Sequence, residues 1–132
     1  MPLIRLFIAC TLGFFASVGE IAVATAQVPP SSAETAHYTG LLAAAARGDA
    51  AGIRALTAKG ETADVTDGRG RTPLHVAAYG RHHDAMRALV AAGANPNTLE
   101  NDRYDIVTIA AVANDVPTLT LALALGASAK NV

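Results

Sequence analysis

The feature that most constrains the fold of this chain is an internal repeat of 33 residues. At that shift LLAAAARGDAAGIRALTAKG (41–60) aligns with LHVAAYGRHHDAMRALVAAG (74–93). A further shift of 33 residues places Val107 on Leu74 and Gly126 on Gly93. Because one such short unit cannot bury an apolar face alone, the repeat predicts units stacked side by side around a continuous core.

Each unit has the same predicted anatomy. A helix of small residues comes first, a tight turn follows, and a second helix carries apolar residues at helical spacing, such as Met86 and Leu89. A glycine then ends the second helix, where a left-handed cap needs no side chain: Gly60, Gly93 and Gly126. The linkers that follow are rich in turn-forming residues.

The second unit carries the most specific motif, which is Thr72-Pro73-Leu74-His75-x-Ala77-Ala78 with Gly93 further on. Together with the period, this motif resembles the ankyrin repeat. The resemblance implies an all-α fold, a solenoid of about three helix-turn-helix repeats joined by β-hairpin-like linkers. The repeats would cover about 39–71, 72–104 and 105–132, so that 39–132 forms one ankyrin-repeat domain.

The motif residues have structural roles in this interpretation. Thr72 is expected to cap the first helix of the unit, and Pro73 suits its first position. The resemblance implies that His75 is a scaffold residue that hydrogen-bonds across the turn. Ala77 and Ala78 allow neighbouring helices to approach closely.

Three positions depart from the pattern. Arg81 stands where the family usually has glycine, and Arg103 stands where the first linker has Gly70, so we expect the second hairpin to be less regular. Pro117 falls early in a predicted helix and is tolerable only within its first turn.

The first 26 residues resemble a secretory signal peptide. A short basic start, MPLIR, precedes an uncharged and mostly apolar run at 6–19, and Ala24 and Ala26 form an A-x-A pair. We therefore predict cleavage after Ala26, a periplasmic location and a flexible leader over 27–38. The apolar run is shorter than the roughly 20 residues that cross a bilayer, so an uncleaved membrane anchor is the weaker alternative.

The histidines are the only clustered residues of a metal-binding type. A zinc site needs three or four converging ligands, whereas the adjacent His82 and His83 would point in different directions on a helix. We expect no metal and no cofactor, with His83 exposed. A metal-binding protein that uses these histidines is a less favoured alternative.

The sequence also lacks the signals of an enzyme. It shows no nucleophile-elbow serine and no glycine-rich phosphate loop that opens on a strand. The net charge of −1 gives no general attraction to nucleic acid or to anionic lipid. We therefore expect a non-catalytic protein that does not bind nucleic acid.

A role in protein–protein interaction is the function that the resemblance implies. In the family, partners dock on the hairpin tips and on the inner face of the first helices. Carried over by position, this surface would contain Arg69, Arg71, Tyr79, Asn101, Asp102, Tyr104 and Val112. Tyrosine and arginine dominate interface hot spots, so we expect Tyr79, Arg69 and Arg71 near its centre. A truncated fragment of a longer repeat protein is the alternative.

The last predicted helix is unusually apolar. Leu119, Ala122 and Leu123 are expected to face the core, which leaves Leu121 and Leu125 on another face. Because repeat arrays normally end in a unit with a polar outer face, this pattern predicts an apolar surface covered by a partner, by further repeats or by a second copy of the chain.

Overall fold

A computed structural model describes residues 27–131 of the chain, so the expected signal peptide at 1–26 lies outside the described residues. Three helix pairs follow one another: α2 (Gly40–Arg47) with α3 (Ala50–Ala58), α4 (Pro73–Tyr79) with α5 (His83–Ala91), and α6 (Ile106–Val112) with α7 (Val116–Ala124). A short helix α1 (Ser32–His37) precedes them, and a 3₁₀ turn η2 (Ala129–Asn131) follows.

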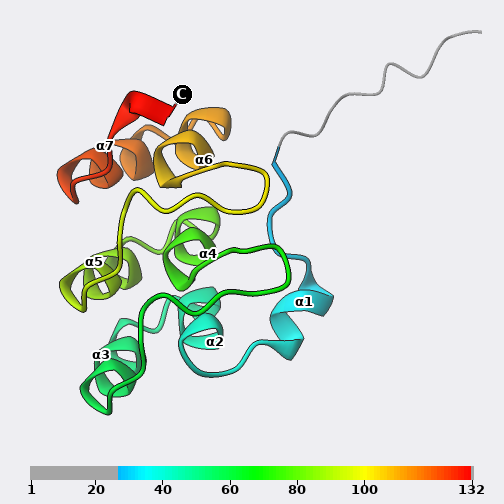
Figure 1. Cartoon of the computed structure of the whole chain (residues 1–132), viewed down its shortest axis with the longest axis vertical. Helices are drawn as coiled ribbons and strands as arrows, with labels where there is room; N and C mark the ends of the chain where they lie inside the picture. Colours follow the sequence, from blue (N-terminus) through cyan, green and yellow to red (C-terminus); the bar gives the residue numbers. More distant parts are fainter. Residues whose placement is uncertain (1–26, 132) are drawn as a thin grey trace, which may run out of the picture.

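The pairs stack into two columns. Figure 1 shows the first helices α2, α4 and α6 in one column, the second helices α3, α5 and α7 in the other, and the long linkers projecting to the same side. Within residues 27–131 the secondary structure is entirely helical, and the linkers are turns. The predicted all-α solenoid of helix-turn-helix repeats is therefore confirmed.

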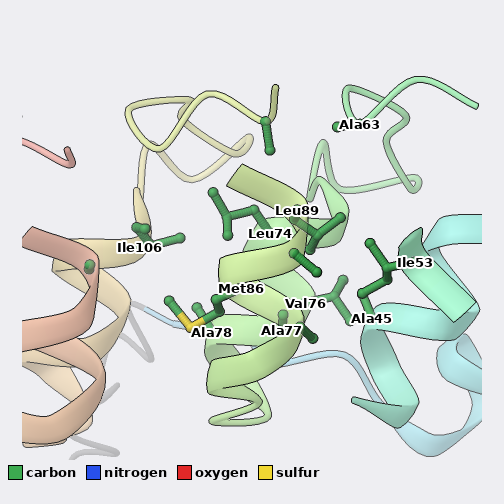
Figure 2. Close-up of a cluster of buried hydrophobic side chains, with 14 of the residues drawn as sticks. Ala45, Ile53, Ala63, Leu74, Val76, Ala77, Ala78, Met86, Leu89 and Ile106 are labelled. Carbon is green, nitrogen blue, oxygen red and sulfur yellow. The ribbon is translucent and has the colours of Figure 1, made fainter. Parts of the chain in front are cut away.

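Small side chains let the columns pack closely. Ala45 of α2 and Ala77 of α4 are fully buried where these helices meet. Larger residues fill the space between the two columns: Figure 2 shows Leu74 of α4 beside Leu89 of α5, both buried. One continuous core runs through all the repeats, as the stacking of units that cannot fold alone requires.

The 33-residue period extends to the backbone conformation. The turn between the two helices of each pair contains one left-handed residue, with φ of 69° at Gly48, 57° at Arg81 and 52° at Asn114. The turn therefore has one conformation in all three repeats, and the two side-chain-bearing residues accept it although glycine suits it better.

The linkers repeat in the same way. Gly70 and Arg103 are both left-handed, with φ of 72° and 67°. In the first linker the Asp67 N–H donates to the Arg71 carbonyl at 3.0 Å, and in the second the Glu100 N–H donates to the Tyr104 carbonyl at 3.0 Å. The expectation of a less regular second hairpin was wrong, because Arg103 adopts the conformation that glycine has in the first.

The helix starts agree with the motif. The Thr72 hydroxyl accepts a hydrogen bond from the His75 N–H at 3.4 Å, and Pro73 begins α4. Pro117 is the second residue of α7, within the first turn, where its missing N–H leaves no helix bond unmade.

The last helix differs from the expectation. Leu123 is 48% exposed, whereas Leu121 and Leu125 are half-buried and pack against the core. Leu121 is the 33-residue equivalent of Ala88, which lies beside α3 of the preceding repeat, so the same face of α7 turns toward the preceding repeat. None of the helices in the described part of the chain has both the length and the apolarity that crossing a membrane requires.

Candidate partner-binding surface

The two hairpin tips lie side by side. The Arg69 carbonyl accepts a hydrogen bond from the Asn101 N–H at 3.0 Å, which joins the first tip to the second. A side chain at Gly70 would collide with that of Asn101, so glycine permits this close approach. Arg69, Asn101 and Asp102, predicted from positions about 30 residues apart, are brought together here, and all three are exposed.

A groove lies beside the first helices, between α4 and α6. It has a volume of about 470 Å³, and Tyr79 of α4 and Val112 of α6 both line it. Val112 is 57% exposed. The structure therefore places these two predicted residues on opposite walls of one concave surface.

The Tyr79 hydroxyl has an unusual position. Although the side chain is only half-buried, its oxygen is shielded and makes no hydrogen bond to any of residues 27–131. Burial raises the pKa of Tyr79 to about 12, so the group stays protonated at neutral pH and can act as a donor. A buried donor without an acceptor costs about 1–3 kcal/mol, which makes this hydroxyl a point where a ligand could gain affinity.

Arg71 is not on the surface, although we expected it near the centre of the partner site. Its side chain is 0% exposed. Its Nε donates to Asp67 Oδ2 at 2.7 Å, its Nη2 to Glu34 Oε1 at 2.8 Å, and its Nη1 to the Val28 carbonyl at 2.9 Å. Such a guanidinium holds elements together, so its loss would disturb the fold as well as any binding.

The network around Arg71 also includes Tyr38, which the sequence did not single out. The Tyr38 hydroxyl donates to Asp67 Oδ2 at 2.5 Å. Burial alone would raise the pKa of the Asp67 carboxyl, but hydrogen bonds from Tyr38 and Arg71 outweigh it and hold that pKa below its usual range. Burial and the bond to Asp67 raise the pKa of Tyr38 well above its usual value. No local pattern marks Tyr38, because its partner lies 29 residues away.

The segment 27–38, which we predicted to be a flexible leader, packs on the repeats in the structure. The Gln27 side-chain amide donates to the Thr108 carbonyl at 2.9 Å, and Pro29 lines the groove. Ser31 and Glu34 cap α1 reciprocally, in a capping box. The Ser-x-x-Glu spacing of that box was the available sequence signal, and the proline- and serine-rich composition concealed it.

Tyr104 supports the second hairpin. It is half-buried against the core, and its N–H donates to Glu100 Oε1 at 3.3 Å. The same oxygen accepts the Asp102 N–H at 3.1 Å. Burial raises the pKa of Glu100 above its usual value. Of the predicted surface residues, Tyr104 is thus one that shapes a hairpin as well as lining its side.

The three histidines form separate contacts. His75 Nδ1 accepts the Thr72 N–H at 3.0 Å, and its Nε2 lies 2.8 Å from the Thr98 carbonyl. His82 Nε2 lies 3.2 Å from the Ala46 carbonyl of the preceding repeat, and His83 Nε2 lies 2.8 Å from Thr118 Oγ1 of the following one. His83 is therefore a contact between repeats and not the exposed residue we expected.

The arrangement of these side chains gives no metal centre within residues 27–131, where no three histidine, cysteine or acidic residues come together. His75 has the scaffold role that its motif implies, since its ring joins the start of α4 to the second linker. Its Nδ1 accepts a hydrogen bond, so Nε2 carries the proton and donates to Thr98.

The comparisons with known proteins agree with this fold. None of the curated proteins searched matches the sequence. A family model described as "Ankyrin repeats (3 copies)" matches residues 6–131, which is most of the chain. The period, the capped motif, the paired helices and this match lead to one conclusion: the chain belongs to the ankyrin-repeat family.

Proposed function

We propose that this chain is a non-catalytic protein-interaction module of the periplasm, which binds a partner protein through its hairpin tips and concave face. Ankyrin repeats generally mediate protein–protein interaction, and the family is typically non-catalytic. The periplasmic location rests on the signal-like pattern of residues 1–26.

The observation that carries the proposal is the continuity of two surfaces. The exposed tip residues Arg69, Asn101 and Asp102 stand beside a groove that Tyr79 and Val112 line. Polar tips supply orientation, and an apolar groove with a tyrosine supplies contact area, which is the usual division of labour in an interface. Because packed helices preform this surface, binding would cost little reorganisation.

The direct test is capture of a partner by cross-linking in periplasmic extract. A variant with Arg69→Ala, Asn101→Ala and Asp102→Ala should retain the helical spectrum and lose about tenfold or more of the captured partner, because one or two good interface contacts are worth that much. The matched control is Asp84→Ala with Arg87→Ala, an exposed ion pair on α5 away from the tips. Equal capture by both variants and the wild type would contradict the proposal.

The location has its own test. The chain expressed from its full gene should be released by osmotic shock of the outer membrane, and the N-terminus of the released protein should be Gln27. Retention in the cytoplasm with Met1 intact would overturn the periplasmic part of the proposal and leave the binding surface unaffected.

A further inference from the structure

The N-terminal segment occupies the concave side of the molecule. Figure 1 shows the chain entering beside α6 and running past α4 to α1, next to α2, so that it crosses the repeats in the reverse of their order. Gln27 contacts the third repeat through Thr108, and Pro29 lies in the groove between α4 and α6. Pro30 lines a smaller pocket beside Tyr79.

The contacts of this segment are those of a bound peptide. Arg71 binds it at two points, a backbone carbonyl at Val28 and a carboxylate at Glu34. Arg69 adds a second cation, with its Nε 3.6 Å from Glu34 Oε1. Two guanidinium groups that share one carboxylate form a specific site for an acidic side chain. The two prolines favour an extended conformation, which suits a shallow groove.

The fit of the segment is incomplete at one position. The Tyr79 hydroxyl is shielded and makes no hydrogen bond within residues 27–131. A different peptide that places a carbonyl or carboxylate oxygen at this hydroxyl would gain a hydrogen bond that the chain's own segment does not make.

Resting on the proposed function, we propose that residues 27–34 are a tethered ligand of the concave groove, and that the partner binds through an extended acidic peptide segment that displaces them from Arg69 and Arg71. Asp67 continues to hold the guanidinium of Arg71 when Glu34 leaves, so the site stays formed. The tether gives the internal segment an effective concentration in the millimolar range, so it screens out weak ligands.

The test uses a fluorescein-labelled synthetic peptide with the sequence of residues 27–38, titrated into the exported chain. Glu34→Gln in the protein weakens the internal segment, so this variant should bind the free peptide about tenfold more tightly than the wild type does. A peptide with glutamine in place of its own glutamate should bind the same variant about tenfold more weakly.

Matched controls make the result specific. Glu61→Gln removes an exposed carboxylate that does not touch the segment, and it should bind the peptide as the wild type does. Should Glu34→Gln reduce helicity, Pro29→Ala loosens the segment without touching Arg71 and carries the same expectation. Equal affinity of all these proteins for the peptide would overturn the inference.

The partner gives a second readout that separates this inference from the proposed function. At limiting protein, Glu34→Gln should capture more cross-linked partner than the wild type. Tyr79→Phe should leave binding of the peptide unchanged and reduce capture of the partner about tenfold, because it removes only the unpaired donor. If the triple tip variant loses the partner while Glu34→Gln and Tyr79→Phe capture it as the wild type does, the proposed function stands and the tethered-ligand inference fails.

Discussion

His75 joins two parts of the chain through a single ring. Its Nδ1 accepts the Thr72 N–H at the start of α4, and its Nε2 donates to the Thr98 carbonyl in the second linker. Burial lowers the pKa of His75, and the nearby carboxylates of Asp67 and Asp105 offset this only in part. The neutral ring is therefore the form that the folded state requires, and a proton on Nδ1 would remove an acceptor.

This geometry predicts a pH dependence of stability. The unfolded chain protonates His75 near pH 6.5, while the folded chain resists protonation to a lower pH, so the free energy of unfolding should fall as pH drops below about 6.5. The slope reaches at most about 1.4 kcal/mol per pH unit. Urea unfolding followed by circular dichroism from about pH 8 to about pH 5.5 measures it.

The variant His75→Asn isolates the contribution of this one ring. It should lower the free energy of unfolding by about 1–3 kcal/mol at about pH 8 and lack the slope, since asparagine does not titrate. Burial raises the pKa of Glu100, which has the opposite effect on stability as pH rises, but this group is present in both proteins and cancels in the difference. The same slope in wild type and variant would show that His75 is not its source.

At the scale of the element, the two linkers have one hairpin conformation with different residues. Gly70 adopts its left-handed position without strain, whereas Arg103 adopts the same position with a side chain that is exposed. A left-handed conformation costs a residue other than glycine about 1–2 kcal/mol. The second hairpin is thus held in place by its neighbours, including the Glu100 side chain that accepts two backbone N–H groups.

Arg103→Gly should therefore stabilise the protein. The relief of strain exceeds the entropy that glycine adds to the unfolded chain, and we expect a net gain of about 0.5–1 kcal/mol in the free energy of unfolding. Arg103→Ala is the matched control, because it removes the same charge and keeps the Cβ atom. A gain of equal size in the alanine variant would assign the effect to charge and not to backbone strain.

At this scale the sequence predicted the three helix pairs well and the N-terminal segment poorly. Caps such as Thr72 and stops such as Gly93 act on residues within a few positions, so their patterns are legible. The segment 27–38 is ordered by Arg71, which lies 43 residues from Val28 and 37 from Glu34. A composition rich in proline and serine gives no indication of such distant partners.

At the scale of the whole molecule, the last repeat carries an exposed apolar face. Val116 is 61% exposed and Leu123 is 48% exposed, and residues seven apart lie on the same face of a helix. We propose that this face of α7 supports self-association, since paired exposed apolar residues gain by leaving water.

Sedimentation equilibrium tests the proposal. The apparent mass of the wild type should rise with concentration, and Val116→Lys with Leu123→Lys should hold it at that of one chain, because a charge on each residue opposes burial. Val65→Lys is the control, since Val65 is also exposed but lies in the first linker. A wild type that stays a single chain at every concentration would rule out self-association through α7.

The sequence by itself determined the repeat, its 33-residue period, its helix pairs and the scaffold role of His75. These follow from caps, glycine positions and apolar spacing, which act within one unit and are copied in the next. Only the tertiary structure decided that Arg71 is buried while Arg69 is exposed, and that residues 27–34 lie in the groove. The reason is physical: the burial of a side chain depends on what distant segment covers it, and hydrogen bonds over 37 and 43 residues are not encoded in any local pattern.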